Sequence, residues 1–207
     1  KFSGAFGYWD RNSAVYERFQ PYAVDTLQKS LSYAKNKEKV ITSINKGLEY
    51  LYRTSFDDQK TKLYAYGLLA KAGYEMTSRA RYSIDQELKI GSMKVSTTAG
   101  TLSTNIDNLT LAYWVSANLN DTKRMLQISD QAQLLLNQIE LGKPISQLAA
   151  GAWFSPNQAL GTSGLYAKSS LNYAHLLTDL SADQIAPVFE TIIANTHEYL
   201  AQQQYRS

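Results

Sequence analysis

The seven residues LTLAYWV, at positions 109–115, decide the fold of this chain. Placed on a helix, they are apolar on almost every side, and such a helix has to be buried on almost every side. Other segments carry a single apolar stripe, with apolar side chains at helical spacing. The clearest stripe runs through Ile185, Val188, Phe189, Ile192, Ile193 and Leu200. The chain therefore predicts two kinds of helix, one fully buried and the other wetted on one face.

The two kinds of helix alternate along the chain, and the buried kind shares a signature. A tyrosine and an alanine stand together before leucine or valine four times, at Tyr22-Ala23, Tyr64-Ala65, Ala112-Tyr113 and Tyr173-Ala174. The signature recurs at about the length of a helical hairpin, which is typical of a toroid or a solenoid. We therefore expect an all-α fold with an inner ring of buried helices and an outer ring of amphipathic helices.

Capping residues, glycine and proline indicate where the helices begin and end. Asp57 or Asp58 and then Asp121 are the expected N-caps, and Gly73 is an expected C′ residue. The expected helices span about 21–35, 40–51, 58–73, 77–91, 103–118, 121–141, 165–177 and 182–204, and 145–164 is expected to be mostly loop.

The last of these helices has two competing starts. Ser181 and Gln184 have the spacing of a capping box, which favours a start at Ala182. Pro187 would delay the start by a turn, because proline is best tolerated in the first turn of a helix.

Composition excludes several classes of function. With 207 residues, 44% of them hydrophobic and 19% charged, the chain can form one domain over 1–207 with a sizeable core. The net charge is only +3 and no basic tract occurs, so we expect no nucleic-acid partner. No apolar run approaches the roughly 20 residues of a membrane span, so this segment is not expected to insert into a membrane. The chain opens without Met, and we expect it to be a piece of a longer protein.

Residues that could carry chemistry are few. Cysteine is absent, which excludes thiolate metal sites and cysteine nucleophiles. Only His175 and His197 could supply an imidazole, and neither has an acid at the spacing of a zinc-binding HExxH array. No phosphate-binding glycine loop and no nucleophile elbow occur. We therefore expect no catalytic site, no cofactor and no metal in this chain.

Three acids near the start of the first inner helix are the only candidates for catalysis. Some helical toroids are glycosidases that place two carboxylates at the mouth of the barrel. Asp10, Glu17 and Asp25 could act in this way. The alternative gives each a structural role, in which Asp10 caps a turn, Glu17 is solvated and Asp25 bonds a neighbouring tyrosine. We favour the structural interpretation.

Two loops carry aromatic side chains that could form a binding surface. Phe6, Tyr8 and Trp9 stand in a glycine-punctuated opening segment, and Trp153 and Phe154 stand in the polar region 145–164. Exposed aromatic side chains indicate a partner. The competing interpretation of the second loop is a lid packed over the end of the toroid.

Several segments together resemble one known family. GAFGYW at 4–9 resembles the GGFGYW-type loop in the thioester-containing domain of bacterial alpha-2-macroglobulins. YAVDTL at 22–27 is similar to the YVxDFL helix of that domain, GLEYL at 47–51 to its GLxYL segment, and LYAYGLLAKAG at 63–73 to its AYALYVLARAG helix. The stretch from LAYW at 111–114 through ND at 120–121 to RM at 124–125 resembles its ALALxxxGDxxRA hairpin, and YRS at 205–207 resembles the start of its next segment. The shared order carries the resemblance, which is closest over residues 4–141.

The resemblance implies an α/α toroid that lacks its first and last helices. In this family the domain carries, in some members, a Cys-Gln thioester within a CxEQ motif upstream of the GFGYW-type loop. This chain has no cysteine. Either the motif precedes Lys1 or the protein belongs to the branch that lost it. Family members trap proteases, because cleavage of a bait region elsewhere lets the protein collapse around the attacker.

We therefore expect a non-catalytic domain of a bacterial alpha-2-macroglobulin-like endopeptidase inhibitor. Its partners would be the other domains of the same polypeptide and, indirectly, the target proteases. The family is exported, so we expect a periplasmic or cell-envelope location, with a distant N-terminal lipid as a possible anchor to the inner membrane. The alternatives are a toroidal carbohydrate-active enzyme and a helical-repeat scaffold with an open groove.

Overall fold

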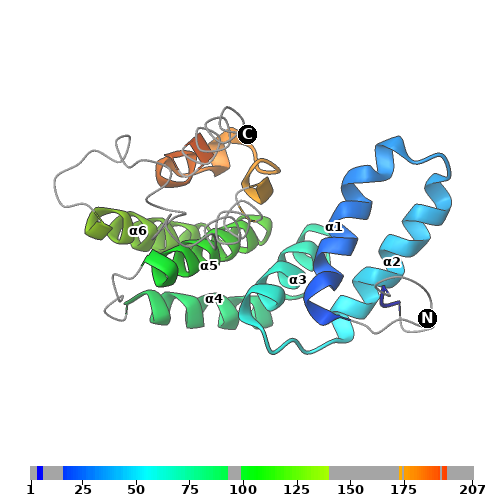
Figure 1. The fold of residues 1–207 in the computed structure, drawn as a ribbon, viewed down its shortest axis with the longest axis horizontal. Helices are drawn as coiled ribbons and strands as arrows, with labels where there is room; N and C mark the ends of the chain where they lie inside the picture. The colour runs from blue at the N-terminus through cyan, green and yellow to red at the C-terminus, as the bar shows by residue number, and fades with distance from the viewer. Residues whose placement is uncertain are drawn as a thin grey trace, which may run out of the picture. The chain divides into compact units, whose positions relative to one another are not determined.

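The structure is a computed structural model that describes residues 4–6, 16–92, 99–139, 173, 175–191 and 193–194. Every regular element in these ranges is helical, which confirms the all-α class (Figure 1). The elements are η1 (Glu17–Phe19), α1 (Gln20–Ser30), η2 (Leu31–Tyr33), α2 (Lys37–Arg53), α3 (Gln59–Lys71), α4 (Thr77–Ser92), α5 (Ala99–Asn118), α6 (Thr122–Ile139) and η5 (Ala182–Gln184). The chain divides into two compact units, Lys1–Ser83 and Ile84–Ser207, with the boundary inside α4.

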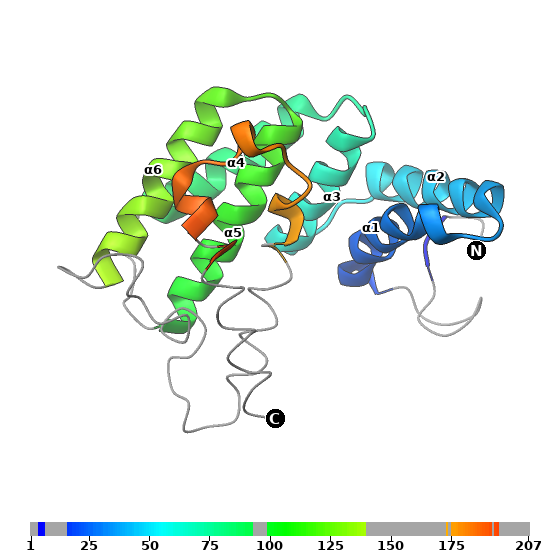
Figure 2. The ribbon, with the colours of Figure 1, turned by 90° about the horizontal axis from the view of Figure 1, so that it is seen from above.

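In the first unit, α1, α2 and α3 pack against one another, and α1 and α2 lie side by side in Figure 2. α3 is buried on nearly all sides, through Thr61, Leu63, Tyr64, Ala65, Gly67, Leu68 and Leu69. α2 instead buries one stripe, made of Ile44, Gly47, Leu48 and Leu51. The contrast between a fully buried and a one-sided helix is the one that the sequence predicts.

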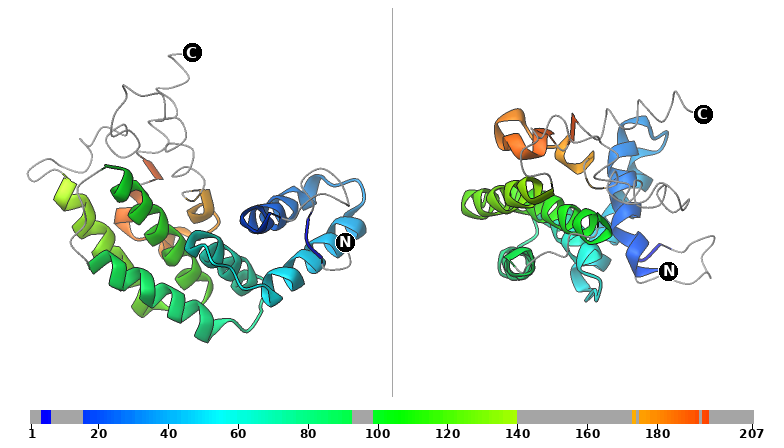
Figure 3. Two further views of the ribbon diagram at one scale, coloured as in Figure 1. Left: turned by 60° about the horizontal axis from the view of Figure 1, so that its bottom comes forward. Right: turned by 60° about the vertical axis from the view of Figure 1, so that its left-hand side comes forward.

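The second unit repeats this contrast. All nine residues from 109 to 117 on α5 are buried, so LTLAYWV lies in the core as expected. α6 packs along α5, as Figure 3 shows, and among its described side chains Ile128 and Ala132 are buried. The Leu126 side chain on another face of α6 is 62% exposed. α6 is therefore an amphipathic helix against a buried one.

α1 departs from the predicted inner-helix pattern. Its buried residues are Gln20, Pro21, Val24 and Asp25, while Tyr22 and Ala23 of the tyrosine–alanine signature are only half-buried. Within its own unit the helix packs on α2 and α3, and these two neighbours cover one side of it. The signature alone therefore does not guarantee burial on every side.

The expected caps of α3 and α6 are confirmed. The Asp58 carboxylate accepts from the Thr61 N–H at 2.9 Å, and the Asp121 carboxylate accepts from the Arg124 N–H at 3.3 Å. Gly73 has a φ of +81° after the end of α3, where the Tyr74 N–H donates to the Leu69 carbonyl at 2.9 Å. That bond defines a Schellman motif, which favours glycine because a side chain is strained at this φ.

Some helix boundaries differ from those expected. α1 ends at Ser30 and continues as the 3₁₀ helix η2, where a helix to about residue 35 was predicted. α5 begins at Ala99 instead of Ser103, which adds Gly100 to the helix although glycine is a weak helix former. The stretch 182–184 is a 3₁₀ helix and the following helical turn begins at Pro187. The expected start of an α-helix at Ala182 is therefore wrong, and the competing start set by the proline is the one observed.

Candidate functional site

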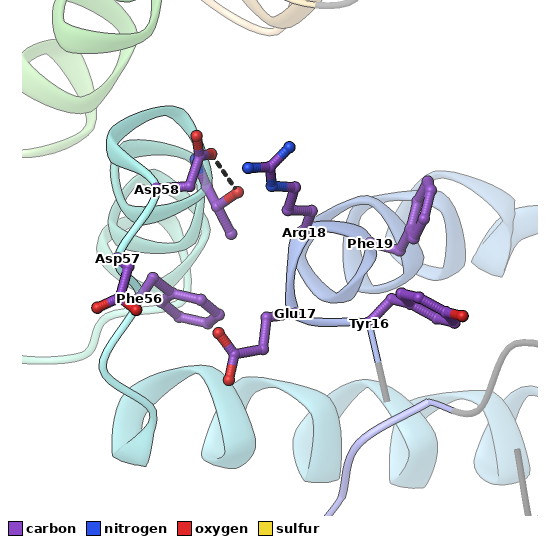
Figure 4. A pocket seen from close by; sticks show the side chains of 8 residues that line it. Tyr16, Glu17, Arg18, Phe19, Phe56, Asp57 and Asp58 are labelled. Atoms are coloured by element: carbon purple, nitrogen blue, oxygen red, sulfur yellow. Dashed lines mark hydrogen bonds between the residues drawn. The ribbon is translucent and has the colours of Figure 1, made fainter. Parts of the chain in front are cut away.

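A pocket beside the predicted acid Glu17 lies between η1 and the start of α3. It has a volume of about 380 Å³ and is shown in Figure 4. Its lining consists of Tyr16, Glu17, Arg18, Phe19, Phe56, Asp57, Asp58 and Thr61. Three carboxylates, one guanidinium and three aromatic rings therefore surround one cavity of the first unit.

Asp58 already has a structural role in this pocket. Its Oδ2 accepts from the Thr61 N–H at 2.9 Å and from the Thr61 hydroxyl at 2.6 Å, drawn as a dashed line in Figure 4. Partial burial of the carboxyl works to raise its pKa. The two Thr61 hydrogen bonds and the positive charges of Arg18 and Lys60 outweigh that effect and hold the pKa of Asp58 below its ordinary value. Asp58 is therefore an ionised N-cap and a poor proton donor.

Glu17 and Asp57 are the acids that remain open to a ligand. Both are exposed, and within the described ranges neither carboxylate has a hydrogen bond or an ion pair. In Figure 4 Glu17 extends toward the Phe56 ring, Arg18 extends toward Asp58, and Tyr16 and Phe19 point the other way. Carboxylates beside an aromatic ring can bind sugar hydroxyls or a cationic group. The pocket offers that binding chemistry at a solvated surface.

Asp25, by contrast, is part of the core. It is 4% exposed, and its Oδ2 accepts from the Tyr64 hydroxyl at 2.7 Å and from Lys29 Nζ at 3.0 Å. The Tyr64 ring also packs edge-on against Tyr22, with 4.8 Å between ring centroids. The predicted bond between Asp25 and a neighbouring tyrosine is confirmed, and it joins α1 to α3. Glu17 is solvated as expected, and Asp10 lies outside the described residues.

The predicted aromatic loops are described only at Phe6. Its N–H donates to Gln20 Oε1 at 2.7 Å, and its ring lies against Gly47, so Phe6 is half-buried on the α1–α2 hairpin. Tyr8, Trp9, Trp153 and Phe154 fall outside the described residues.

Of the two histidines, the structure describes His175 alone. His175 is half-buried in a short helical stretch, and its backbone carbonyl accepts from the Thr178 hydroxyl at 2.7 Å. His197 lies outside the described residues. Among the side chains that the structure places, no group of three His, Asp or Glu residues could hold a metal ion.

The sequence did not indicate that Arg18 and Phe56 line the pocket, or that Gln20 binds the backbone of Phe6. Phe56 stands immediately before Asp57 and Asp58. An aromatic residue next to two acids at the start of a helix could have indicated a binding pocket there. Gln20 precedes Pro21, and nothing in its local sequence indicates that its side chain binds the backbone of Phe6. Contacts of this kind depend on the fold that brings distant segments together.

Comparisons with known proteins leave the family open. No family model, no curated protein and no solved structure matches this chain. In the part of the chain that the structure describes, no helix is both long enough and apolar enough to cross a membrane.

Proposed function

We propose that this chain is a non-catalytic α/α-toroid domain of a bacterial alpha-2-macroglobulin-like endopeptidase inhibitor. The observation that carries the proposal is the alternation of buried and amphipathic helices. α3 and residues 109–117 of α5 are buried on nearly every side, whereas α2 buries one stripe and α6 exposes the apolar side chains of Leu126 and Leu134. Two concentric layers of helices explain this alternation, because only inner helices have neighbours on every side.

Four of the segments that resemble the family lie on, or at the ends of, described helices of this chain. GLEYL lies on the buried stripe of α2, and LYAYGLLAKAG spans buried α3 and ends at the Gly73 cap. LAYW lies in the core of α5, and RM follows the Asp121 cap of α6. The proposal is supported by this distribution, in which these four motifs fall in turn on helices α2, α3, α5 and α6.

The hydrogen bonds that hold Asp25 favour a structural or binding role for this chain over catalysis. A glycosidase needs one carboxyl group that donates a proton and a second that acts as base or nucleophile. Asp25 is held by Tyr64 and Lys29, and Asp58 is an N-cap with a lowered pKa. These two acids serve the fold.

A protease-trapping assay tests the proposed function. The full polypeptide that contains this chain would be incubated with a broad-specificity protease. A trapped protease should still hydrolyse a small chromogenic peptide but should lose most of its activity on casein, because a cage excludes large substrates. Equal inhibition of both substrates would indicate active-site inhibition, and inhibition of neither would contradict the proposal.

The carbohydrate-active alternative rests on the pocket that holds Glu17 and Asp57. Its test is a pair of variants, Glu17→Gln and Asp57→Asn, assayed on a panel of chromogenic glycosides. We expect both variants and the unaltered chain to stay at background. A measurable glycosidase rate that either variant abolishes would establish the alternative.

A further inference from the structure

The turn between α1 and α2 concentrates positive charge at one end of the first unit. Three lysines, Lys35, Lys37 and Lys39, fall within five consecutive positions, and the only acid in the stretch 31–39 is Glu38. All three lysines are exposed, and no described residue forms an ion pair with their ammonium groups. Within the described chain, the positive charge of this turn is therefore only partly balanced, by Glu38.

The same turn exposes a large aromatic side chain. Tyr33, the last residue of η2, is 88% exposed, the highest value among the large hydrophobic residues that the structure describes. Ile41, one helical turn after Lys37 on the same side of α2, is 44% exposed. η2 packs on α1 and α2, and Figures 1 and 2 show the turn at the end of this hairpin that lies away from α3. We call residues 31–41 the basic turn.

A membrane surface with anionic headgroups matches both features of the basic turn. Each lysine near such a surface strengthens binding roughly fivefold. A tyrosine ring prefers the headgroup region, because its body is apolar and its hydroxyl is polar. Other partners fit less well, since a stable protein–protein interface takes about 20–30 residues from each side. Three lysines are also too few to follow a nucleic-acid backbone.

We propose that the basic turn binds the surface of a membrane that contains anionic phospholipids. The lysines would lie near the phosphate groups and the Tyr33 ring would lie at the level of the headgroups. Contact of this kind is made at the surface and needs no membrane-spanning helix. The proposal depends only on the α1–α2 hairpin, so it succeeds or fails independently of the proposed protease trap.

Co-sedimentation of the full chain with lipid vesicles tests the proposal. Vesicles of phosphatidylcholine alone are compared with vesicles in which one third of the lipid is phosphatidylglycerol, at low salt. We expect the chain to sediment with the anionic vesicles only. It should be released at high salt, because the screening length falls to about 3 Å at 1 M. Equal sedimentation with both kinds of vesicle, or with neither, would overturn the proposal.

Two charge-matched triple variants locate the contact on the chain. Replacing all three lysines of the basic turn with glutamine should weaken binding to the anionic vesicles about 100-fold, at roughly fivefold for each lysine. The control carries Lys71→Gln, Lys89→Gln and Lys123→Gln, at exposed lysines of α3, α4 and α6, and loses the same net charge. It should weaken binding by no more than about threefold, because distant charges are screened. An equal loss in the two variants would show that net charge alone attracts the membrane.

Tyr33→Ser distinguishes a lipid surface from an acidic protein partner. On anionic vesicles this variant should bind at least about threefold more weakly, because the ring no longer enters the headgroup region. On soluble polyglutamate, which offers charge alone, it should bind as the unaltered chain does. Tyr82→Ser is the matched control, because Tyr82 is 67% exposed on α4, and it should bind the vesicles normally. Unchanged vesicle binding by Tyr33→Ser would favour an acidic protein partner and contradict the membrane proposal.

Discussion

At the scale of single residues, the buried faces of α5 combine close packing with specific hydrogen bonds. Ala112 is fully buried, and its neighbours Tyr113 and Trp114 are among the largest buried side chains described. The Tyr113 hydroxyl donates to the Gln184 carbonyl at 2.6 Å and accepts from the Ala186 N–H at 3.0 Å. A small residue thus provides close approach, while the tyrosine reaches across to a distant segment and satisfies its polar end there.

Replacing Ala112 with leucine should destabilise the chain. The added methylene groups have no free volume at a fully buried position, so we expect a loss of about 1–3 kcal/mol in the free energy of unfolding. Urea denaturation followed by circular dichroism measures this loss. Ala194→Leu, the same change at an exposed helical residue, is the control and should alter stability by less than about 0.5 kcal/mol. Equal effects of the two changes would refute the assignment of Ala112 to the core.

Tyr113→Phe should reveal the contribution of the hydroxyl and its pH dependence. Losing both hydrogen bonds should cost about 1–2 kcal/mol at pH 7. Burial raises the pKa of Tyr113, and the Ala186 hydrogen bond only partly opposes that effect. Because the folded-state pKa exceeds the unfolded value, the neutral hydroxyl stabilises the fold fully below pH 10, and this stability is lost as the pH rises through the folded-state pKa.

The measurement is the free energy of unfolding of Tyr113→Phe and the unaltered chain between pH 8 and pH 11. The difference between the two proteins should shrink above about pH 10, since only the unaltered chain loses the contribution of this phenol. Tyr52→Phe is the control, because Tyr52 is 40% exposed. A constant difference across this pH range would show that Tyr113 does not titrate differently in the folded state.

At the scale of helices, α4 and α6 are joined by one arginine. Arg124 on α6 donates from Nε and Nη2 to the Asp85 carboxylate on α4 at 2.9 and 2.8 Å, and from Nη1 to Asp121 at 2.9 Å. These bonds raise the pKa of Arg124 further above its already high value. The guanidinium thereby binds the N-cap of its own helix and a carboxylate of the neighbouring helix.

Arg124→Lys should weaken this connection although the positive charge is kept. A lysine cannot make the paired bonds to Asp85, and because that carboxylate is 43% exposed we expect a loss of only about 1 kcal/mol. Thermal unfolding measures the change. Arg53→Lys is the matched control, because its ion pair with Glu49 is exposed on both sides, and it should have no measurable effect. A larger loss in the control would contradict the importance of the paired geometry.

At the scale of the whole molecule, the proposed toroid and the open helical scaffold differ in size. A compact protein of 207 residues has a radius of gyration of about 17 Å, whereas a solenoid of the same length is markedly longer. We expect small-angle X-ray scattering of the chain to give the compact value with a symmetric distance distribution. A much larger radius with a long tail in that distribution would support the scaffold and contradict the ring.

The sequence alone determined the helical class, the buried core of α5 and several helix ends. These features are local, because the apolar period, Asp58, Asp121 and Gly73 act within one or two turns of the chain. The sequence favoured a tyrosine partner for Asp25, but only the tertiary structure decided that this partner is Tyr64 of α3 and that Gln20 holds the backbone of Phe6. Such contacts arise between segments far apart in the chain, and the local sequence around each residue contains no record of its distant partner.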